Sequence, residues 1–260
     1  MPEWNPEQYL KFRTERTQPA VDLISRIPLD SPADVLDVGC GPGNSTVELF
    51  KRFPNANILG IDSSERMIET AAAQYPQMRF AVCDAEHELP SIGRRFDVVF
   101  SNACIQWVPE HRKLIPALMD LLRPGGILAV QTPMNYEEPI HQIISRTVAS
   151  QEWSSKLSSS RIFYNLTPAE YFDLLSEITE DFSLWSTTYY HMMPSHEAIM
   201  EWYRATGLRP YLDALKTETE RNAFEQQIFL QVQKEYPRQQ SGKIIFRFPR
   251  FFFLAKRSRF

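Results

Sequence analysis

Cysteine is scarce in this sequence. The 260 residues include only three cysteines, Cys40, Cys83 and Cys104. The count is odd and no two have the C-x-x-C spacing, so the sequence encodes neither a disulfide framework nor a zinc ribbon. We therefore expect a reduced, intracellular protein.

Long apolar runs and a leader segment are also missing. The strongly apolar stretches stay well short of the ~20 residues that a membrane-spanning helix needs. The start, from Met1 to Asn5, lacks the basic segment followed by an apolar one that marks a secretory signal. These absences predict a cytoplasmic protein with no membrane partner.

An excess of basic residues is absent as well. Lysine and arginine number 28 against 32 aspartates and glutamates, which gives a formal net charge of −4. Because nucleic-acid binding depends mainly on basic surface, no nucleic-acid partner is expected. A small anionic ligand remains compatible with this charge, since a few arginines gathered in one place outweigh the overall sign locally.

The first half of the chain alternates short apolar runs with helical patterns, and the hydrophobic fraction of 43% allows a substantial core. This alternation predicts an α/β fold with right-handed crossovers and a parallel sheet covered on both faces. Arg123-Pro124-Gly125-Gly126 is expected to end the last helix of this half. The predicted strands are residues 35–38, 57–61, 78–82, 96–100 and 127–130, and the predicted helices are 45–53, 63–75 and 111–122.

The second half has a different texture. Residues 135–180 are expected to form mostly helix and loop, residues 185–190 a strand, and residues 194–236 a helical insertion before a final aromatic strand at 243–254. The sequence has no repeats and no charged linker, which favours one domain. The last helix of the insertion places four apolar side chains on one face, namely Phe224, Ile228, Phe229 and Val232.

A glycine-rich loop follows the first predicted strand, with the sequence Asp37-Val38-Gly39-Cys40-Gly41-Pro42-Gly43-Asn44. Its glycines let the backbone turn sharply and approach a ligand closely. A dinucleotide fingerprint reads G-x-G-x-x-G, but here the third glycine comes one residue early and a proline stiffens the loop. This spacing favours a ligand without phosphates, although a tight turn alone would also explain the loop.

Polar residues follow the next three strands. Asp62 ends the second strand about 20 residues beyond the loop, where a carboxylate accepts hydrogen bonds from a ribose diol; an N-cap role beside Ser63 is the alternative. Asp84 follows the third strand, where it can accept from an adenine amino group, and Asn102 follows the fourth. The carboxyl ends of these strands form the crevice in which open α/β sheets bind ligands.

These motifs, taken together, resemble those of class I S-adenosylmethionine methyltransferases. Residues 35–44 are similar to the first family motif, and Asp62, Asp84 and residues 123–126 match later motifs in order, within a resemblance covering about residues 33–131. The resemblance implies S-adenosylmethionine as cofactor, S-adenosylhomocysteine as product, and ligand contacts at the methionine, ribose and adenine parts. The implied cofactor residues are Asp37, Gly39, Gly41, Asn44, Asp62, Ser63, Met67, Asp84, Ala85 and Asn102.

A narrower resemblance lies outside the glycine loop. Four segments are similar to trans-aconitate 2-methyltransferases: residues 4–20, 104–111, 187–196 and 201–210. This resemblance implies methyl transfer to a carboxylate of trans-aconitate or a closely related small polycarboxylic acid. The implied fold is a Rossmann-like class I sheet, mostly parallel with an antiparallel last strand, and with a helical cap inserted before that strand. We expect a single domain over residues 1–260, with a cofactor-binding core at 30–135 and substrate-covering segments at 1–20 and 194–240.

Candidate acceptor residues follow from the chemistry of a polycarboxylate. Arginine pairs bidentately with carboxylate, which makes Arg13, Arg16 and Arg209 candidates, although the first two can equally lie on a solvated helix face. The other expected acceptor residues are Gln106, Trp107, Tyr189, Tyr190 and His191, and one of the two tyrosines is expected in the core because they alternate on a strand. No general base is required, since a carboxylate is already ionised at neutral pH. Trp107, Tyr190 and His191 are therefore expected to position the reactants.

Several other interpretations compete with this one. His196-Glu197 begins an H-E-x-x-H pattern, but residue 200 is methionine, so no metal site is predicted. The same fold can act on another small or acyl-carrier-bound acid, or serve as a non-catalytic cofactor-binding regulator. A regulator is disfavoured by the intact glycine loop and Asp62. We expect a monomer, with the basic residues of the last strand pointing outward, namely Lys243, Arg247, Arg250 and Arg257.

Overall fold

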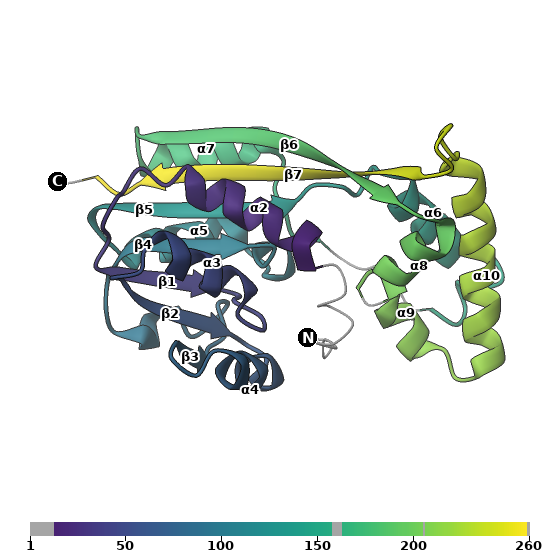
Figure 1. The fold of residues 1–260 in the computed structure, drawn as a ribbon, viewed down its shortest axis with the longest axis horizontal. Coiled ribbons are helices and arrows are strands. Elements are labelled where there is room, and N and C mark those ends of the chain that lie inside the picture. The colour runs from purple at the N-terminus through teal and green to yellow at the C-terminus, as the bar shows by residue number, and fades with distance from the viewer. Residues whose placement is uncertain (1–12, 158–162, 205, 259–260) are drawn as a thin grey trace. The chain divides into compact units, whose positions relative to one another are not determined.

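The computed structural model describes residues 13–157, 163–204 and 206–258. Within these residues the chain forms a seven-stranded sheet with the strand order β3-β2-β1-β4-β5-β7-β6 (Figure 1). The strands are β1 (Asp34–Val38), β2 (Asn57–Asp62), β3 (Arg79–Val82), β4 (Phe96–Asn102), β5 (Leu122–Pro133), β6 (Phe182–Met193) and β7 (Ile244–Lys256).

The strand directions confirm the predicted class of fold. β1 pairs in parallel with β2 and β4, β2 with β3, and β4 with β5. β7 runs antiparallel to β5. Inner strands such as β1 and β4 are apolar along most of their length because helices cover both of their faces.

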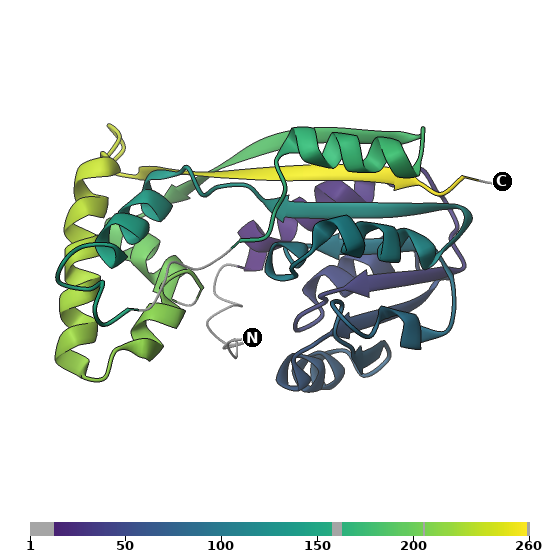
Figure 2. The ribbon, with the colours of Figure 1, turned by 180° about the vertical axis from the view of Figure 1, so that it is seen from behind.

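Helices cover the two faces of the sheet. Figures 1 and 2 show α2 (Arg13–Ser25) and α3 (Asn44–Arg52) on one face, and α5 (His111–Asp120) and α7 (Pro168–Ile178) on the other. The helix predicted at residues 63–75 is α4 (Glu65–Gln74), which begins after Ser64 because the Ser64 hydroxyl accepts the Met67 N–H at 3.3 Å.

The segment Arg123-Pro124-Gly125-Gly126 corrects one prediction. α5 ends at Asp120, and β5 begins at Leu122, so this segment belongs to the start of the strand and does not terminate the helix. The register with β4 is irregular there, and Gly125 has a φ of 82°. Gly125 keeps a backbone conformation typical of turns, but pairing of this segment with β4 makes it part of the strand.

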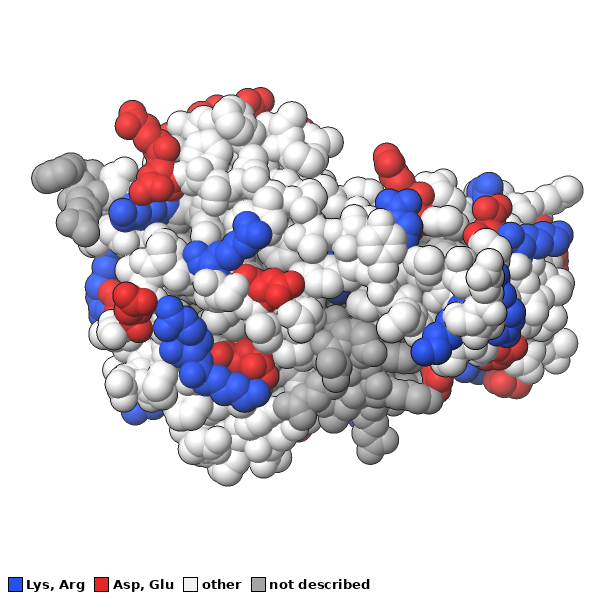
Figure 3. All heavy atoms as spheres, turned by 45° about the horizontal axis from the view of Figure 1, so that its top comes forward, with Lys and Arg blue, Asp and Glu red and all other residues white. Residues whose placement is uncertain are grey.

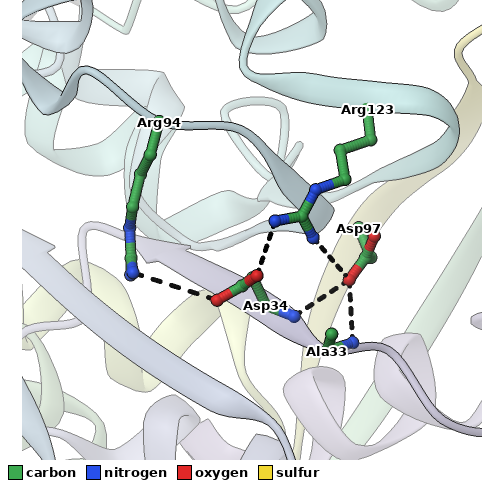
Figure 4. A network of polar contacts seen from close by, with 5 residues as sticks. All are labelled: Ala33, Asp34, Arg94, Asp97 and Arg123. Atoms are coloured by element: carbon green, nitrogen blue, oxygen red, sulfur yellow. Dashed lines mark hydrogen bonds and ion pairs between the residues drawn. The ribbon is translucent and has the colours of Figure 1, made fainter.

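An ion-pair network holds the amino ends of β1 and β4 together (Figure 4). The Arg123 guanidinium donates to Asp34 at 2.6 Å and to Asp97 at 2.9 Å, and Arg94 lies 3.9 Å from Asp34. Asp97 also accepts the N–H groups of Ala33 and Asp34. Burial alone would raise the pKa of Asp97, but the hydrogen bonds from the Asp34 N–H and from Arg123 outweigh it and lower the pKa. Arg123, the arginine of the family motif, therefore stabilises the fold by pairing with Asp34 and Asp97.

The chain divides into two compact units. Unit 2 comprises residues 13–133, 163–187 and 250–258 of the described chain, and it holds β1 to β5 with the helices named above. Unit 1 comprises residues 134–157 and 188–249, apart from residue 205, and β6 and β7 contribute residues to both units. The helices of unit 1 are α6 (Pro139–Val148), α8 (His196–Arg204), α9 (Arg209–Ala214) and α10 (Glu218–Glu235).

Unit 1 has an apolar core of its own. α10 begins at a capping box formed by Thr217 and Glu220. Its inner face buries Phe224, Ile228 and Val232 completely, which confirms the predicted helical face, and Phe229 packs partly buried against the same cluster.

Charged residues of the last strand depart from one expectation. The Arg247 side chain is 55% exposed, as predicted, but Arg250 is only 5% exposed, so its predicted outward position is wrong. The reason is that β7 lies between β5 and β6, and both of its faces are covered in this region. Phe251 stacks on Tyr171 of α7, whereas Phe252 on the other face stacks on Trp185 of β6.

Three further findings concern the described residues as a whole. None of their helices is long and apolar enough to span a membrane. None of their histidine, cysteine and acidic side chains form a group of three that could hold a metal ion. On the face drawn in Figure 3, basic side chains lie beside acidic ones.

Candidate active site

The glycine loop joins β1 to α3 and is fastened to β2. The N–H groups of Gly39 and Cys40 both donate to the Ile61 carbonyl, at 2.8 and 2.9 Å. Gly39 and Gly41 have φ angles of 73° and 54°, which L side chains rarely adopt. A Cβ on Gly39 would lie 2.2 Å from the Cys104 sulfur, whereas a Cβ on Gly41 would meet no atom within 4 Å. Gly39 is therefore required by packing, and Gly41 borders open space.

Asp37 lies beneath this loop and is completely buried. One carboxylate oxygen, Oδ2, accepts the hydroxyls of Ser45 and Thr46 at 2.7 Å each. Burial raises the pKa of Asp37 to about 6, despite these hydrogen bonds. The other oxygen, Oδ1, is buried and has no hydrogen-bond partner in the described chain. Asp37 thus presents an unsatisfied acceptor, which carries negative charge above about pH 6.

Asp62 ends β2 beside the loop. Its Oδ2 accepts the Gly41 N–H at 3.0 Å, and its Oδ1 accepts the Ser64 N–H at 2.9 Å. Burial raises the pKa of Asp62, although both hydrogen bonds oppose the shift. Each oxygen retains a lone pair, so the carboxylate can still accept from a diol. Ser63 next to it is partly buried, and Met67 in the first turn of α4 is 5% exposed.

The loop after β3 turns back on itself. Asp84 is partly buried, and its Oδ1 accepts the Glu86 N–H at 2.9 Å. The Asp84 N–H donates to the Glu88 carboxylate at 2.7 Å. Asp84 and Ala85 thus sit at the carboxyl end of the sheet, in a turn whose backbone conformation is fixed by neighbouring side chains.

The segment after β4 is strained. Ala103 has a φ of 53°, which is unusual for a residue with a Cβ. Its N–H donates to the Gln131 carbonyl at 2.9 Å, and its carbonyl accepts from the Gln106 side chain at 2.7 Å. The amide N–H of Gln106 thus helps to hold this segment in place. Trp107, one residue further, packs on Phe163 with ring centroids 5.0 Å apart.

The chemistry of these groups indicates the kind of ligand that fits. Three side-chain oxygens around the loop are buried without a hydrogen-bond donor in the part of the chain described, namely those of Asp37, Asn44 and Asn102. With Asp62 they form a set of acceptors and negative charges. Such a set suits a cationic, hydroxyl-bearing ligand and repels a pyrophosphate. S-adenosylmethionine, with its ammonium, sulfonium and ribose diol, meets that requirement.

The predicted acceptor residues of β6 lie in unit 1. Tyr189 is partly buried and packs against the apolar core of this unit, so of the two tyrosines it is the one on the core side. The His191 ring lies 5.1 Å from that of Trp202, whereas Tyr190 is 63% exposed. Tyr189 and His191 therefore share the packed side of the strand, and Tyr190 lies on the other side.

The three candidate arginines are described unequally. Arg209 begins α9, its Nε lies 3.5 Å from the Asp213 carboxylate, and its Nη1 is buried without a hydrogen-bond partner among the described residues. The side chains of Arg13 and Arg16, at the start of α2, lie outside the described part of the chain, as do the other predicted segments within residues 1–12.

Two buried polar residues near the site were not assigned to it from the sequence. Gln131 on β5 and Arg250 on β7 are buried, at 0% and 5% exposure, and touch one another near the carboxyl end of β5. The position of Gln131 at the end of a predicted strand, as for Asn102, was the signal that could have revealed it.

Comparisons with known proteins agree with this geometry. Residues 35–126 match the family described as "Methyltransferase domain". The chain is 41% identical over 262 residues to the trans-aconitate 2-methyltransferase of Methylobacterium radiotolerans, covering 99% of this chain and 100% of the relative. It is 43% identical over 258 residues to the protein of the same name from an Azoarcus species, with 99% and 100% covered. The fold resembles the YcgJ protein of Bacillus subtilis, with a TM-score of 0.59 at 15% identity, over 93% of this chain and 99% of that one.

The sheet, the glycine loop and these matches define an S-adenosylmethionine-dependent class I methyltransferase. The matches to the curated relatives are not confined to the cofactor half. At 41–43% identity they extend over 99% of the chain, so the chain belongs to the trans-aconitate 2-methyltransferase family. Both resemblances that the sequence predicted are thereby confirmed.

Proposed function

We propose that this protein transfers the methyl group of S-adenosylmethionine to a carboxylate of trans-aconitate, giving a methyl ester and S-adenosylhomocysteine. The observation that carries the proposal is the extent of the family match, which covers 99% of the chain and 100% of the relatives. A match limited to residues 35–126 would support only the cofactor half. Here it includes the helical segments, where acceptor specificity is expected.

The cofactor site is assigned to the carboxyl ends of β1 to β4. When bound, S-adenosylmethionine supplies an electrophilic methyl group on a positively charged sulfur. Asp37 provides a buried carboxylate for the cationic methionine part, and Asp62 accepts from the ribose. Open space at Gly41 leaves room for the ligand beside the backbone. The full assignment is Asp37, Gly39, Gly41, Asn44, Asp62, Ser63, Met67, Asp84, Ala85 and Asn102.

No side chain has to move a proton in this reaction. A carboxylic acid with an ordinary pKa near 4 is ionised at neutral pH, so the nucleophile arrives already charged. Rate then depends on alignment of the reacting atoms and on removal of water from the carboxylate. Trp107, Tyr190 and His191 are assigned to positioning.

Binding of the acceptor carboxylates is assigned first to arginine. Arg209 supports this assignment because one of its terminal nitrogens is buried without a partner in the described residues. Arg13 and Arg16 complete the proposed set of cations. The remaining assigned acceptor residues are Gln106, Trp107, Tyr189, Tyr190 and His191.

The acidic net charge and the isolated cysteines support further parts of the proposal. These are a cytoplasmic location and a small polycarboxylate as partner in place of nucleic acid. A monomeric state without a membrane partner completes the proposal.

The decisive experiment presents the enzyme and methyl-labelled S-adenosylmethionine with a panel of di- and tricarboxylic acids. Mass spectrometry should find one added methyl group on trans-aconitate, with lower turnover on cis-aconitate, citrate and shorter diacids. Calorimetric titration with S-adenosylhomocysteine verifies that each preparation is folded and competent. A preparation that binds the nucleoside but methylates none of these acids contradicts the proposed acceptor. Cofactor binding without methylation of any acid, small or acyl-carrier-bound, would indicate a regulatory protein.

A further inference from the structure

Four polar side chains of unit 2 form a row on one face of the sheet. Asp37 pairs with the residue two positions before Asn102, and Asn102 pairs directly with Gln131. Arg250 pairs with the residue two positions after Gln131. Because side chains two residues apart in a strand share a face, all four face the same way. This polar row consists of Asp37 on β1, Asn102 on β4, Gln131 on β5 and Arg250 on β7.

The row lies on the face covered by α2 and α3. Asp37 shows this directly, because it accepts the hydroxyls of Ser45 and Thr46 on α3. The alternation of β7 agrees, since Phe251, the neighbour of Arg250, faces the opposite side and stacks on Tyr171.

The two ends of the row differ in chemistry. At the β1 and β4 end, the unsatisfied atoms are acceptors, Asp37 Oδ1 and Asn102 Oδ1. At the β5 and β7 end are donors. Gln131 Nε2 is buried with no hydrogen-bond partner within the described residues, and the buried guanidinium of Arg250 places a positive charge beside it. The Arg250 Nη1 donates to Gln131 Oε1 at 3.5 Å, which turns the Gln131 amide so that its oxygen faces the cation and its N–H groups remain available.

The other face of β5 provides a contrast. Thr132, the next residue, is also completely buried, but its hydroxyl has acceptors. Gln106 Oε1 lies 3.2 Å from the hydroxyl oxygen and Asn165 Oδ1 lies 2.9 Å from it. A buried amide without a partner is costly, and folded proteins rarely keep one unless a ligand or water satisfies it. Gln131 is fully buried and unsatisfied at Nε2, and the neighbouring guanidinium makes an anionic ligand a better partner for this end of the row than a water molecule.

We propose that Gln131 and Arg250 form a carboxylate-binding site, and that this carboxylate belongs to the acceptor acid. The inference rests on the proposed function and deepens it. An amide N–H beside a guanidinium matches the two oxygens of a carboxylate. The acceptor end of the row suits the cationic cofactor and the donor end suits the anionic acid, so the change of polarity between β4 and β5 separates their two sites. The Ala103 N–H bond to the Gln131 carbonyl keeps these strand ends together.

Gln131→Glu is the sharpest test, because it exchanges the N–H donors for a carboxylate of the same size. The new charge faces Arg250, so the folded state is retained or stabilised, whereas an acceptor carboxylate is repelled. Affinity for trans-aconitate, measured by calorimetry on the complex with S-adenosylhomocysteine, should fall about tenfold or more. Affinity for S-adenosylhomocysteine should stay within about twofold of wild type.

Arg250→Lys is the second variant, and Arg257→Lys is its control. Lysine keeps the charge but loses the planar fork, so acceptor affinity should again fall while S-adenosylhomocysteine binding persists. Arg257, just beyond β7, donates to carbonyls of Met119, Asp120 and Leu122, where α5 ends and β5 begins. Its replacement should leave acceptor affinity unchanged. Denaturant unfolding of each variant distinguishes lost binding from lost fold.

Three outcomes overturn the proposal in recognisable ways. Unchanged acceptor affinity in folded Gln131→Glu removes the site. The variants Gln131→Glu and Arg250→Lys can instead lose S-adenosylhomocysteine binding but still bind an analogue that lacks the amino-acid carboxylate. That result assigns the donors to the cofactor's own carboxylate. If the wild-type protein binds no polycarboxylate from the panel, the proposed function is overturned as well. This outcome is recognisable because it concerns the wild-type protein and not a variant.

Discussion

Gly39 and Gly41 stand two residues apart in the same loop, and the structure predicts opposite consequences for their replacement by alanine. Both have positive φ angles, 73° and 54°, so each substitution costs about 1–2 kcal/mol of left-handed backbone strain. At Gly41 nothing is added to that cost, because a Cβ meets no atom within 4 Å. At Gly39 the Cβ would lie 2.2 Å from the Cys104 sulfur and 2.3 Å from its Cβ. Overpacking of this kind adds roughly 1–3 kcal/mol.

Of the two variants, Gly41→Ala is expected to lose more cofactor affinity, and Gly39→Ala is expected to lose more stability. Gly41→Ala places a methyl group in the open space assigned to the ligand, so S-adenosylhomocysteine binding should be lost, while the free energy of unfolding of the free protein falls only by the backbone strain of about 1–2 kcal/mol. Gly39→Ala should unfold more easily, and adding Cys104→Gly should restore part of its stability by removing both overlapping atoms. Calorimetry and urea unfolding on the same preparations measure both quantities. A folded Gly41→Ala protein that binds S-adenosylhomocysteine like wild type would refute the reasoning and reduce the loop to a turn.

Three more predictions follow from the site and its support. Asp62→Ala should weaken S-adenosylhomocysteine binding by about one to two decades in calorimetry, since a charge-assisted hydrogen bond is lost, and unchanged affinity would remove Asp62 from the site. Burial raises the pKa of Asp37 from 3.8 to about 6, so stability of the free protein should fall as pH rises through that interval, while cofactor affinity should rise between about pH 5 and 7. Asp37→Asn should flatten both profiles, and persistence of either profile would contradict the assignment. Arg123→Met should lower the free energy of unfolding by about 1 kcal/mol, since the arginine side chain is 41% exposed and water screens its ion pairs; kcat should not change, and an effect on kcat alone would contradict a structural role.

Sequence reasoning recovered those parts of the fold that are determined locally. β1 and β4 are recognisable as largely apolar runs because both of their faces are buried. The helix α4 is recognisable as well, because its cap at Ser64 is made within one turn. The start of β5 was misread because proline and glycine usually signal a turn, whereas pairing with β4 decides the outcome there.

The candidate site could be proposed from the sequence only where its residues are contiguous. The glycine loop and Asp62 are recognisable from their spacing in the sequence. The structure adds the 3.0 Å hydrogen bond from the Gly41 N–H to Asp62 that joins them. Gln131 and Arg250 are 119 residues apart, so no local pattern relates them. An arginine in a strand is ordinarily solvated, and only the covered faces of β7 show that Arg250 is not.

The helical segment that leaves β6 and returns in β7 closes on itself. Arg238 bridges to Ile244 at the start of β7 and also donates to the Pro194 carbonyl just past β6, at 3.4 Å. Since β6 and β7 are also neighbours in the sheet, the excursion begins and ends at nearly the same place. Chain excursions with adjoining ends tolerate insertion, deletion and replacement. Descendants of one ancestral methyltransferase can therefore exchange this segment and acquire a new acceptor, while inheriting the cofactor half unchanged.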